Sequence, residues 1–229
     1  MRRIRKILSV ILATLMVISI IPITASAAVS GDWEYSVISE EAKTATLTKY
    51  SGSAVDVVIP TTLDGYAIIS INRTAFNNNQ KIKSVVVGNV VESIGYDAFG
   101  ECRALESVTL GNNLEEIGMQ AFQYCESLKT ISIPGTVETI GLQAFFACYG
   151  LKTVTIGEGV TTLGTSMFIH CKSLEAIFLP ASLTTIEDYA FANCTSLKDI
   201  FFAGTPEQWA TAQEIMEKIL KDLDVTYEI

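Results

Sequence analysis

The sequence predicts an α/β repeat solenoid, in which stacked units share a parallel sheet on one face and short helical turns elsewhere, with a cap at both ends. The first observation is a column of aromatic residues at a constant interval of 23: Phe76, Phe99, Phe122, Phe145, Phe168 and Phe191. The second is a column of branched aliphatic residues at the same interval: Ile71, Ile94, Ile117, Ile140, Leu163 and Ile186. Because no insertion interrupts the six units, and a unit this short cannot bury its apolar face alone, the units must stack on one another.

The first 27 residues have the three parts of a signal peptide. Met1 to Lys6 is basic, an apolar run extends from Ile7 to Ile23, and Ala25-Ser26-Ala27 has the small residues that a signal peptidase accepts. An uncleaved membrane anchor is the alternative, since this run of 17 residues lies near the lower limit for spanning a bilayer. Cleavage removes four basic and no acidic residues, which changes the formal net charge from −9 to −13. No membrane attachment is predicted after cleavage.

Residues 28–70 are predicted to form an amino-terminal β cap. Alternating runs occur at 33–37 and 45–48, and Val57-Val58-Ile59-Pro60 repeats the strand-then-proline ending of Ile131-Ser132-Ile133-Pro134. Such a cap would add one strand to the sheet and cover the apolar surface at the end of the solenoid.

Residues 71–205 hold the six units, and the unit that begins at Ile117 illustrates their pattern. The stretch Leu128-x-x-Ile131-x-Ile133 alternates near its end as a short strand does, with Thr130 and Ser132 facing away from the buried side chains. The preceding stretch has the apolar spacing of a single turn of α-helix or 3₁₀-helix: Ala121, Phe122, Cys125 and Leu128. Each unit is therefore predicted to supply one strand and one short helical turn.

The pattern I-x-x-x-A-F-x-x-C-x-x-L-x-x-I-x-I-P resembles the BspA-like leucine-rich repeats of bacterial secreted and surface proteins. The resemblance covers about residues 71–205 and includes the Ala-Phe pair and the Cys of most units. The sequence departs from it at Met167, which replaces Ala in the fifth unit, and at Asn79, which replaces Cys in the first. The resemblance implies a leucine-rich repeat fold and a role in adhesion to host proteins or to other cells.

Residues 206–229 are predicted to form a carboxyl-terminal cap of one helix and one short strand. Thr205-Pro206-Glu207-Gln208 has the form of a capping box with Pro at the first helical position. A helix at 206–223 would place six apolar residues on one face: Trp209, Ala212, Met216, Ile219, Leu220 and Leu223. Val225, Tyr227 and Ile229 then alternate as a strand does. The alternative is an amphipathic helix that binds a partner.

The five cysteines of the chain form a single column: Cys102, Cys125, Cys148, Cys171 and Cys194. Exported proteins often contain disulfides, but side chains in one column point the same way, which opposes the dihedral geometry of a disulfide. The spacing also lacks the paired cysteines of a zinc site. We therefore predict a structural column of buried thiols, and the family resemblance implies the same structural role.

The sequence predicts no catalysis, no cofactor and no metal site. His170 is the only histidine and is predicted to be an exposed turn residue, so no base is positioned to activate a cysteine nucleophile. Gly159–Ser166 approximates a phosphate-loop spacing, but Thr165 stands where Lys is required. The acidic composition argues against a nucleic-acid partner.

The outward positions of the predicted strands form a candidate ligand-binding face, because solenoids commonly bind ligands on their sheets. Phe178 and Phe201 are predicted to be adjacent rings that stack on a sugar or anchor an apolar side chain. The alternative is that the closing helix covers Phe201. The candidate contacts combine this pair with neighbouring hydroxyls and with two lysines at the strand edge: Thr109, Ser132, Thr155, Phe178, Phe201, Lys129 and Lys152.

These observations predict a noncatalytic binding protein that is secreted, either released or retained at the cell surface, and that recognises an extracellular protein or glycan. The alternative is a structural or spacer module of a cell envelope or extracellular matrix, for which a plain Ser/Thr face without a selective site would suffice.

Overall fold

The computed structural model describes residues 28–205, 217–219 and 221–223. The predicted signal peptide at 1–27 and the predicted strand at the carboxyl end lie outside the described residues, as does most of the predicted closing helix.

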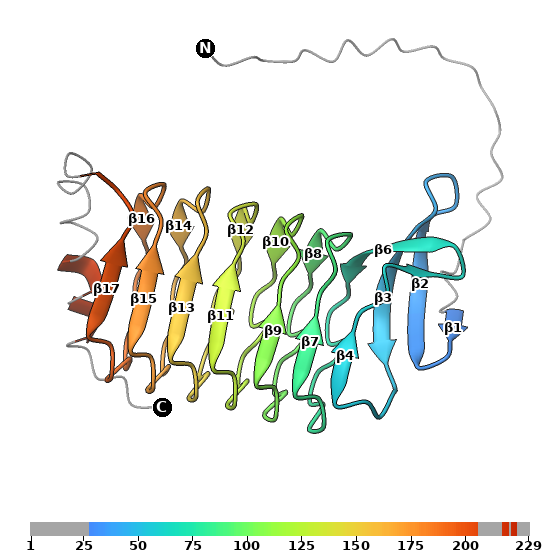
Figure 1. Cartoon of the computed structure of the whole chain (residues 1–229), viewed down its shortest axis with the longest axis horizontal. Coiled ribbons are helices and arrows are strands. Elements are labelled where there is room, and N and C mark those ends of the chain that lie inside the picture. Colours follow the sequence, from blue (N-terminus) through green and yellow to red (C-terminus); the bar gives the residue numbers. More distant parts are fainter. Residues whose placement is uncertain (1–27, 206–216, 220, 224–229) are drawn as a thin grey trace, which may run out of the picture.

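The described chain is a stack of repeats in which two ladders of strands run along the long axis (Figure 1). We call the first ladder the long-strand sheet. Its seven strands pair in parallel with neighbours one unit apart and are β4 (Asp56–Val58), β7 (Ser84–Val86), β9 (Ser107–Thr109), β11 (Thr130–Ile133), β13 (Thr153–Ile156), β15 (Ala176–Leu179) and β17 (Asp199–Phe202). The predicted solenoid with a parallel sheet is confirmed.

The second to sixth units each also supply a second, two-residue strand that the sequence pattern does not predict. These strands carry the aliphatic column and are β8 (Ser93–Ile94), β10 (Glu116–Ile117), β12 (Thr139–Ile140), β14 (Thr162–Leu163) and β16 (Thr185–Ile186). Strands β8, β10 and β12 pair in parallel, as do β14 and β16. Two-residue strands are too short for an alternating pattern to show in the sequence.

The phenylalanine column forms the centre of the core. All six rings are buried, and successive ring centroids lie between 4.7 and 5.6 Å apart in stacked arrangements. Parallel strands repeat at about 4.8 Å, so identical side chains in successive units lie directly above one another. The strand spacing thus sets a ring separation at which offset stacking is favourable.

The predicted helical turn is replaced by a non-helical turn, since no helix is assigned anywhere in residues 28–205. Gln120 and Tyr124 have left-handed backbone angles, with φ of 58° and 54°, which interrupt any helix. Their amides donate to the carbonyl oxygens of Leu142 and Phe146 in the next unit, at 3.0 and 2.8 Å. The turn therefore uses its backbone donors to bind the neighbouring unit rather than to build a helix.

The amino-terminal segment occupies the end of the solenoid where the sequence predicts a cap. Strands β1 (Ala28–Ser30), β2 (Trp33–Ser39) and β3 (Thr44–Tyr50) pair antiparallel, and β3 continues in parallel onto β6 (Tyr66–Ile71), which also pairs with β5 (Thr62–Leu63). The ring of Tyr50 stacks on that of Phe76, with 5.5 Å between centroids. This contact extends the aromatic column by one ring beyond the first unit.

At the other end, the described helical residues 217–219 and 221–223 lie against the turn of the sixth unit. The Asp222 carboxylate accepts hydrogen bonds from the amides of Tyr189 and Phe191 at 3.2 and 3.3 Å, and Ile219 is fully buried. Among the described residues, no helix is long and apolar enough to cross a membrane.

Candidate binding site

The outer face of the long-strand sheet carries a straight line of side chains from neighbouring strands. Ser132 pairs with Thr155, Thr155 with Phe178, and Phe178 with Phe201. Thr109 on β9 occupies the same column, and all five residues are exposed. Alternation along each strand turns these side chains outward while their neighbours enter the core.

Phe178 and Phe201 form an exposed aromatic pair at the carboxyl-terminal end of this line. Their ring centroids lie 4.6 Å apart with an angle of 11° between the ring planes. The two side chains are 40% and 49% exposed. The described helical residues contact the turn at 189–191. The alternative that a closing helix covers Phe201 depends on residues 206–216, which lie outside the described residues.

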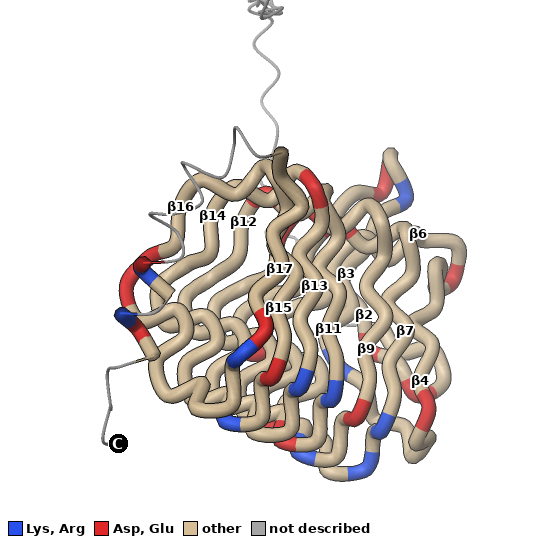
Figure 2. Tube along the Cα trace, turned by 60° about the vertical axis from the view of Figure 1, so that its left-hand side comes forward, with Lys and Arg blue, Asp and Glu red and all other residues tan. Residues whose placement is uncertain are grey.

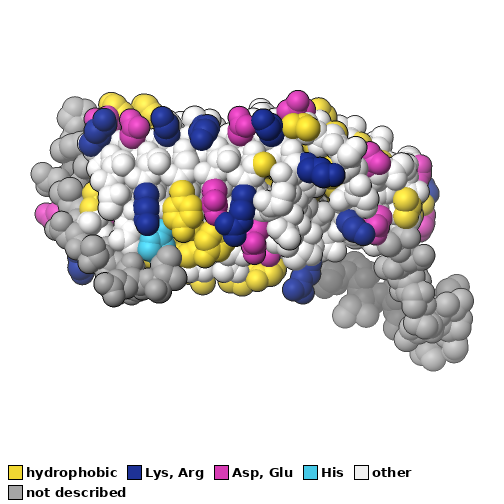
Figure 3. All heavy atoms as spheres, turned by 90° about the horizontal axis from the view of Figure 1, so that it is seen from below, with side chains coloured by type: hydrophobic (Ala, Val, Ile, Leu, Met, Phe, Trp, Pro, Cys, Tyr) yellow, Lys and Arg dark blue, Asp and Glu magenta, His cyan; other side chains and the backbone are white. Residues whose placement is uncertain are grey.

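A row of charged residues borders the face where the long strands begin (Figure 2), and their side chains line one edge of the surface in Figure 3. In chain order the row comprises Lys83, Glu106, Lys129, Lys152, Glu175 and Lys198. Two ion pairs within it join Lys83 to Glu106 at 3.4 Å and Lys198 to Glu175 at 3.9 Å. Exposed pairs of this kind contribute about 0–1 kcal/mol of stability, so the row mainly sets the local charge. Lys129 and Lys152 are its two adjacent cations.

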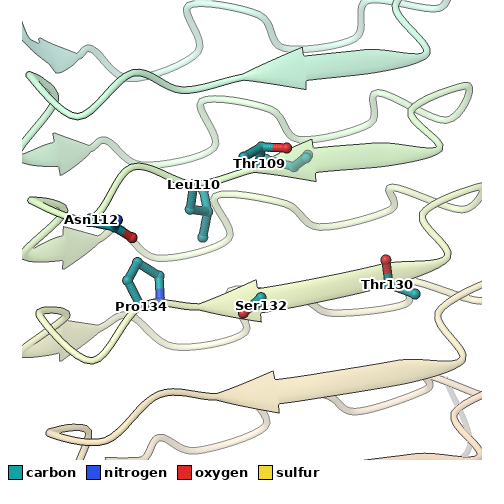
Figure 4. Close-up of a pocket in the computed structure, with 7 residues that line it drawn as sticks. Thr109, Leu110, Asn112, Thr130, Ser132 and Pro134 are labelled. Carbon is teal, nitrogen blue, oxygen red and sulfur yellow. The ribbon is translucent and has the colours of Figure 1, made fainter.

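A pocket of about 300 Å³ opens in the sheet between β9 and β11 (Figure 4). We call it the β9–β11 pocket, and its lining residues are Val108, Thr109, Leu110, Asn112, Thr130, Ser132 and Pro134. These strands share one paired position, Thr130 with Ser107, whereas β11 and β13 share four. Strands β9 and β11 are therefore unpaired toward Leu110, and the pocket lies between these unpaired parts of the two strands.

Pro134 lies at the opening, and Pro180 is the equivalent proline after β15, where β13 and β15 keep three paired positions. In two other units the equivalent residue donates its amide to the preceding unit: Gly157 to the carbonyl of Ile133 at 2.8 Å, and Ala203 to that of Leu179 at 3.0 Å. Proline has no amide hydrogen and cannot make this bond to Leu110. Leu110 is 9% exposed, whereas Ile133 is fully buried and Ile156, which faces Pro180, is 4% exposed. The missing hydrogen bond therefore contributes to the opening but does not produce it alone.

The pocket lining is chemically mixed and carries no charged side chain. Hydroxyls come from Thr109, Thr130 and Ser132, an amide from Asn112, and apolar surface from Leu110 and its neighbours. Thr109 and Ser132 are among the contacts predicted from the sequence, whereas the remaining lining residues are not. Pro134 is only a partial signal, because proline cannot donate to the ladder but Pro180 ends β15 in the same way.

Comparison with known families identifies the repeat. Residues 69–198 match the BspA type leucine-rich repeat region in six copies. The chain belongs to the BspA-type leucine-rich repeat family. No curated protein sequence matches the chain.

Solved structures of bacterial leucine-rich repeat proteins resemble this BspA-type chain. The leucine-rich repeat protein of T. pallidum is 23% identical, with a TM-score of 0.72 over 83% of this chain and 96% of the other. A leucine-rich cell surface protein of Faecalibacterium prausnitzii is 31% identical, with a TM-score of 0.61 over 78% of this chain and 55% of the other. A Bacteroides ovatus protein is 28% identical, with a TM-score of 0.57 over 76% and 53%. The chain thus spans about half the length of the last two.

The cysteine column of these BspA-type units consists of free, buried thiols. Each thiol donates to a backbone carbonyl of the preceding unit, with sulfur to oxygen distances of 3.1–3.3 Å. Burial raises the pKa of Cys102 to about 12 and raises the pKa values of Cys125 and Cys171 well above the ordinary range. Cys102, Cys125 and Cys171 are thus held protonated, in a state that disfavours nucleophilic chemistry.

The prediction that His170 is an exposed turn residue is wrong, because its side chain is only 4% exposed. Its backbone is left-handed, with φ of 65°, and its ring packs edge-on against that of Phe146 with 5.6 Å between centroids. Burial, followed by the charge of Lys172, lowers the pKa of His170. In the described chain no three metal-ligating side chains come together.

Proposed function

We propose that this BspA-type protein is exported and acts as a noncatalytic recognition protein, binding a protein or glycan outside the cell on the long-strand sheet. The observation that carries the proposal is the exposed Phe178–Phe201 pair at the end of a line of hydroxyl side chains.

The exposed apolar surface of the two rings favours ligand binding. Burying apolar surface releases about 25 cal/mol per Å², so two exposed rings are a favourable anchor for a ligand. Their near-parallel stacking, at 11°, makes one continuous platform rather than two separate contacts. Aromatic residues of this kind commonly dominate binding energy at interfaces. The hydroxyls of Thr155 and Ser132 beside the platform supply the polar contacts that orient a ligand.

Two observations support an extracellular or cell-surface location. Residues 1–27 have the basic, apolar and small-residue parts of a signal peptide. The Faecalibacterium prausnitzii relative, 31% identical, is described as a cell surface protein. Cleavage after Ala27 would give a mature chain that begins at Ala28, where β1 starts.

The test is saturable binding to an array of glycans, extracellular-matrix proteins and cell-surface proteins, using wild type and a Phe178→Ala/Phe201→Ala variant. The variant should lose at least about tenfold in affinity, since each hot-spot ring contributes more than about 1 kcal/mol. The matched control is Met119→Ala/Leu142→Ala, which removes two exposed apolar side chains one unit apart elsewhere on the chain.

Unchanged binding by the phenylalanine variant would exclude this face as the binding site. No binding at all by folded wild-type protein would instead favour a structural or spacer role in an envelope or matrix, the second candidate function. That alternative is supported by the small, uncharged outward residues Thr109, Ser132 and Thr155.

A further inference from the structure

We propose that the ligand of this face is a neutral, linear oligosaccharide that crosses the strands, with one sugar ring in the β9–β11 pocket and another on the Phe178–Phe201 platform. This inference rests on the proposed function and names the ligand class of the same face.

The lining of the β9–β11 pocket suits a sugar ring. A pyranose has hydroxyls around its edge and apolar C–H groups on its faces, and the pocket offers partners for both. Thr109, Ser132 and Asn112 present hydroxyl and amide groups, while Leu110 and Pro134 present apolar surface (Figure 4). At about 300 Å³ the pocket is at the small end of ligand sites, which fits one ring rather than a large ligand.

The charges around the β9–β11 pocket favour a neutral ligand. No charged side chain lines the pocket, so a carboxylate or sulfate that entered it would lose hydration without gaining an ionic partner. The lysines of the bordering row lie where the strands begin, at the other end of β11 from Pro134. Lys129 directly precedes β11, whereas Pro134 directly follows it. The net charge of −9 for the whole chain further disfavours an anionic polymer.

The register of the sheet selects an extended ligand. Four strand steps separate β9 from β17, which is about 19 Å at about 4.8 Å per step. That distance exceeds one sugar ring, and Ser132, Thr155 and Phe178 lie on a straight line across it. A linear chain of sugars can therefore touch the pocket, the intervening hydroxyl of Thr155 and the aromatic platform together.

The face is less suited to a polypeptide. An extended peptide that adds to a sheet binds along a strand edge through backbone hydrogen bonds. Here the line of contacts runs across the strands over their side chains, and the backbone groups of β11, β13 and β15 are already paired with each other. Hydroxyls and stacked rings at regular intervals match the repeating polar edges and apolar faces of a sugar chain.

The experiment is calorimetric titration of the purified protein with neutral gluco-, xylo- and manno-oligosaccharides, from disaccharide to hexasaccharide. Oligogalacturonates of the same lengths serve as the anionic comparison. At least one neutral series should bind, with affinity that rises with length until pocket and platform are both occupied and then levels off. The Phe178→Ala/Phe201→Ala variant should lose this dependence on length.

Two pocket variants test the other subsite. Pro134→Ala restores the missing amide and is expected to close the ladder, as Ala203 does in its own unit, and to lower affinity about tenfold. Pro180→Ala is its matched control, because it restores the equivalent amide after β15, where β13 and β15 already share three paired positions, and should leave the β9–β11 pocket unchanged. Ser132→Ala removes one exposed hydroxyl without disturbing the fold, and it should also lower affinity.

Three results would overturn the inference, and each has a different consequence for the proposed function. If only anionic sugars or a protein bind, and the phenylalanine variant abolishes that binding, the recognition face stands and the ligand class is wrong. If neutral sugars bind equally to wild type, Pro134→Ala and Ser132→Ala, the pocket is not a subsite. If binding survives in the phenylalanine variant, the proposed face itself fails.

Discussion

Cys125 donates its thiol hydrogen to the backbone carbonyl oxygen of Phe99 in the preceding unit, with 3.3 Å between sulfur and oxygen. The other four cysteines make the same bond to the phenylalanine 26 residues earlier. The cysteine column is therefore a ladder of interunit hydrogen bonds beside the stacked rings. A disulfide between neighbours would have to break two of these bonds.

The first prediction follows from this ladder. We expect all five cysteines to remain free thiols, even after export into an oxidising environment, and native protein to react slowly because burial raises the pKa of Cys102 to about 12. Titration with a thiol reagent in denaturant should count five thiols per chain, and the melting temperature should not change with reductant. A mass deficit that corresponds to one disulfide would contradict the prediction.

The second prediction concerns the aromatic core. Phe122→Ala removes a fully buried ring that stacks on Phe99 and Phe145, and should lower the free energy of unfolding by about 3–5 kcal/mol. Phe178→Ala removes an exposed ring and should cost only about 1 kcal/mol, the value of one aromatic contact. Urea denaturation of both variants measures the contrast, and equal losses would show that the column is not the centre of the core.

The third prediction concerns backbone strain at Thr74. This β-branched, exposed residue has a left-handed φ of 57°. Left-handed backbone costs an L-residue about 1–2 kcal/mol, and glycine removes this cost. Glycine also gives the unfolded chain more conformational entropy, which offsets about 0.5–1 kcal/mol of the gain. Thr74→Gly should therefore stabilise the fold by about 0.5–1 kcal/mol. Thr153→Gly, within β13, is the matched control and should destabilise it, as chemical denaturation would show.

The fourth prediction is a pH dependence at the carboxyl-terminal helix. Burial raises the pKa of Asp222 above 3.8, although the Phe191 amide, the charge of Lys218 and the Tyr189 amide act against it. Because the folded pKa lies above the unfolded one, the folded state binds this proton more tightly. The contribution of Asp222 to stability is thus fully present below its unfolded pKa and is lost as pH rises through its folded pKa.

Asp222→Asn carries no such proton, so the stability of wild type relative to this variant should increase as pH falls from about 6 to 3. Asp188 acts in the opposite direction, since its hydrogen bond with Lys218 lowers its pKa, but it is present in both proteins. Urea denaturation of both proteins at a series of pH values provides the measurement. A difference that is constant or falls with acidification would contradict the assignment.

The repeat period was sufficient to predict the solenoid because it constrains packing directly. Six phenylalanines at one interval can be buried together only if the units stack, and the structure stacks them. The same columns also predict that Phe178 and Phe201 lie side by side, since identical positions in neighbouring parallel strands are in register. Whether this pair binds a ligand stays a prediction.

Other features depend on the backbone and are not visible in apolar spacing. Ala121, Phe122, Cys125 and Leu128 have the spacing of a helical turn, but left-handed angles at Gln120 and Tyr124 direct the amides toward the next unit. The burial of His170 was missed because a column of mixed composition indicates exposure only on average. The β9–β11 pocket lies where Pro134 lacks an amide hydrogen, but Pro180 lacks one too while β13 and β15 stay paired at three positions, so the opening also depends on the neighbouring strand.

The constant unit length has a consequence for how such a face evolves. Each unit advances the sheet by one strand step, so the separation between the Pro134 opening and the Phe178–Phe201 platform is a whole number of steps of about 4.8 Å. Duplication or loss of a 23-residue gene segment between them would lengthen or shorten this separation by one step while every remaining unit kept its neighbours. A change in the number of repeats would thus adapt the protein to ligands of a different length.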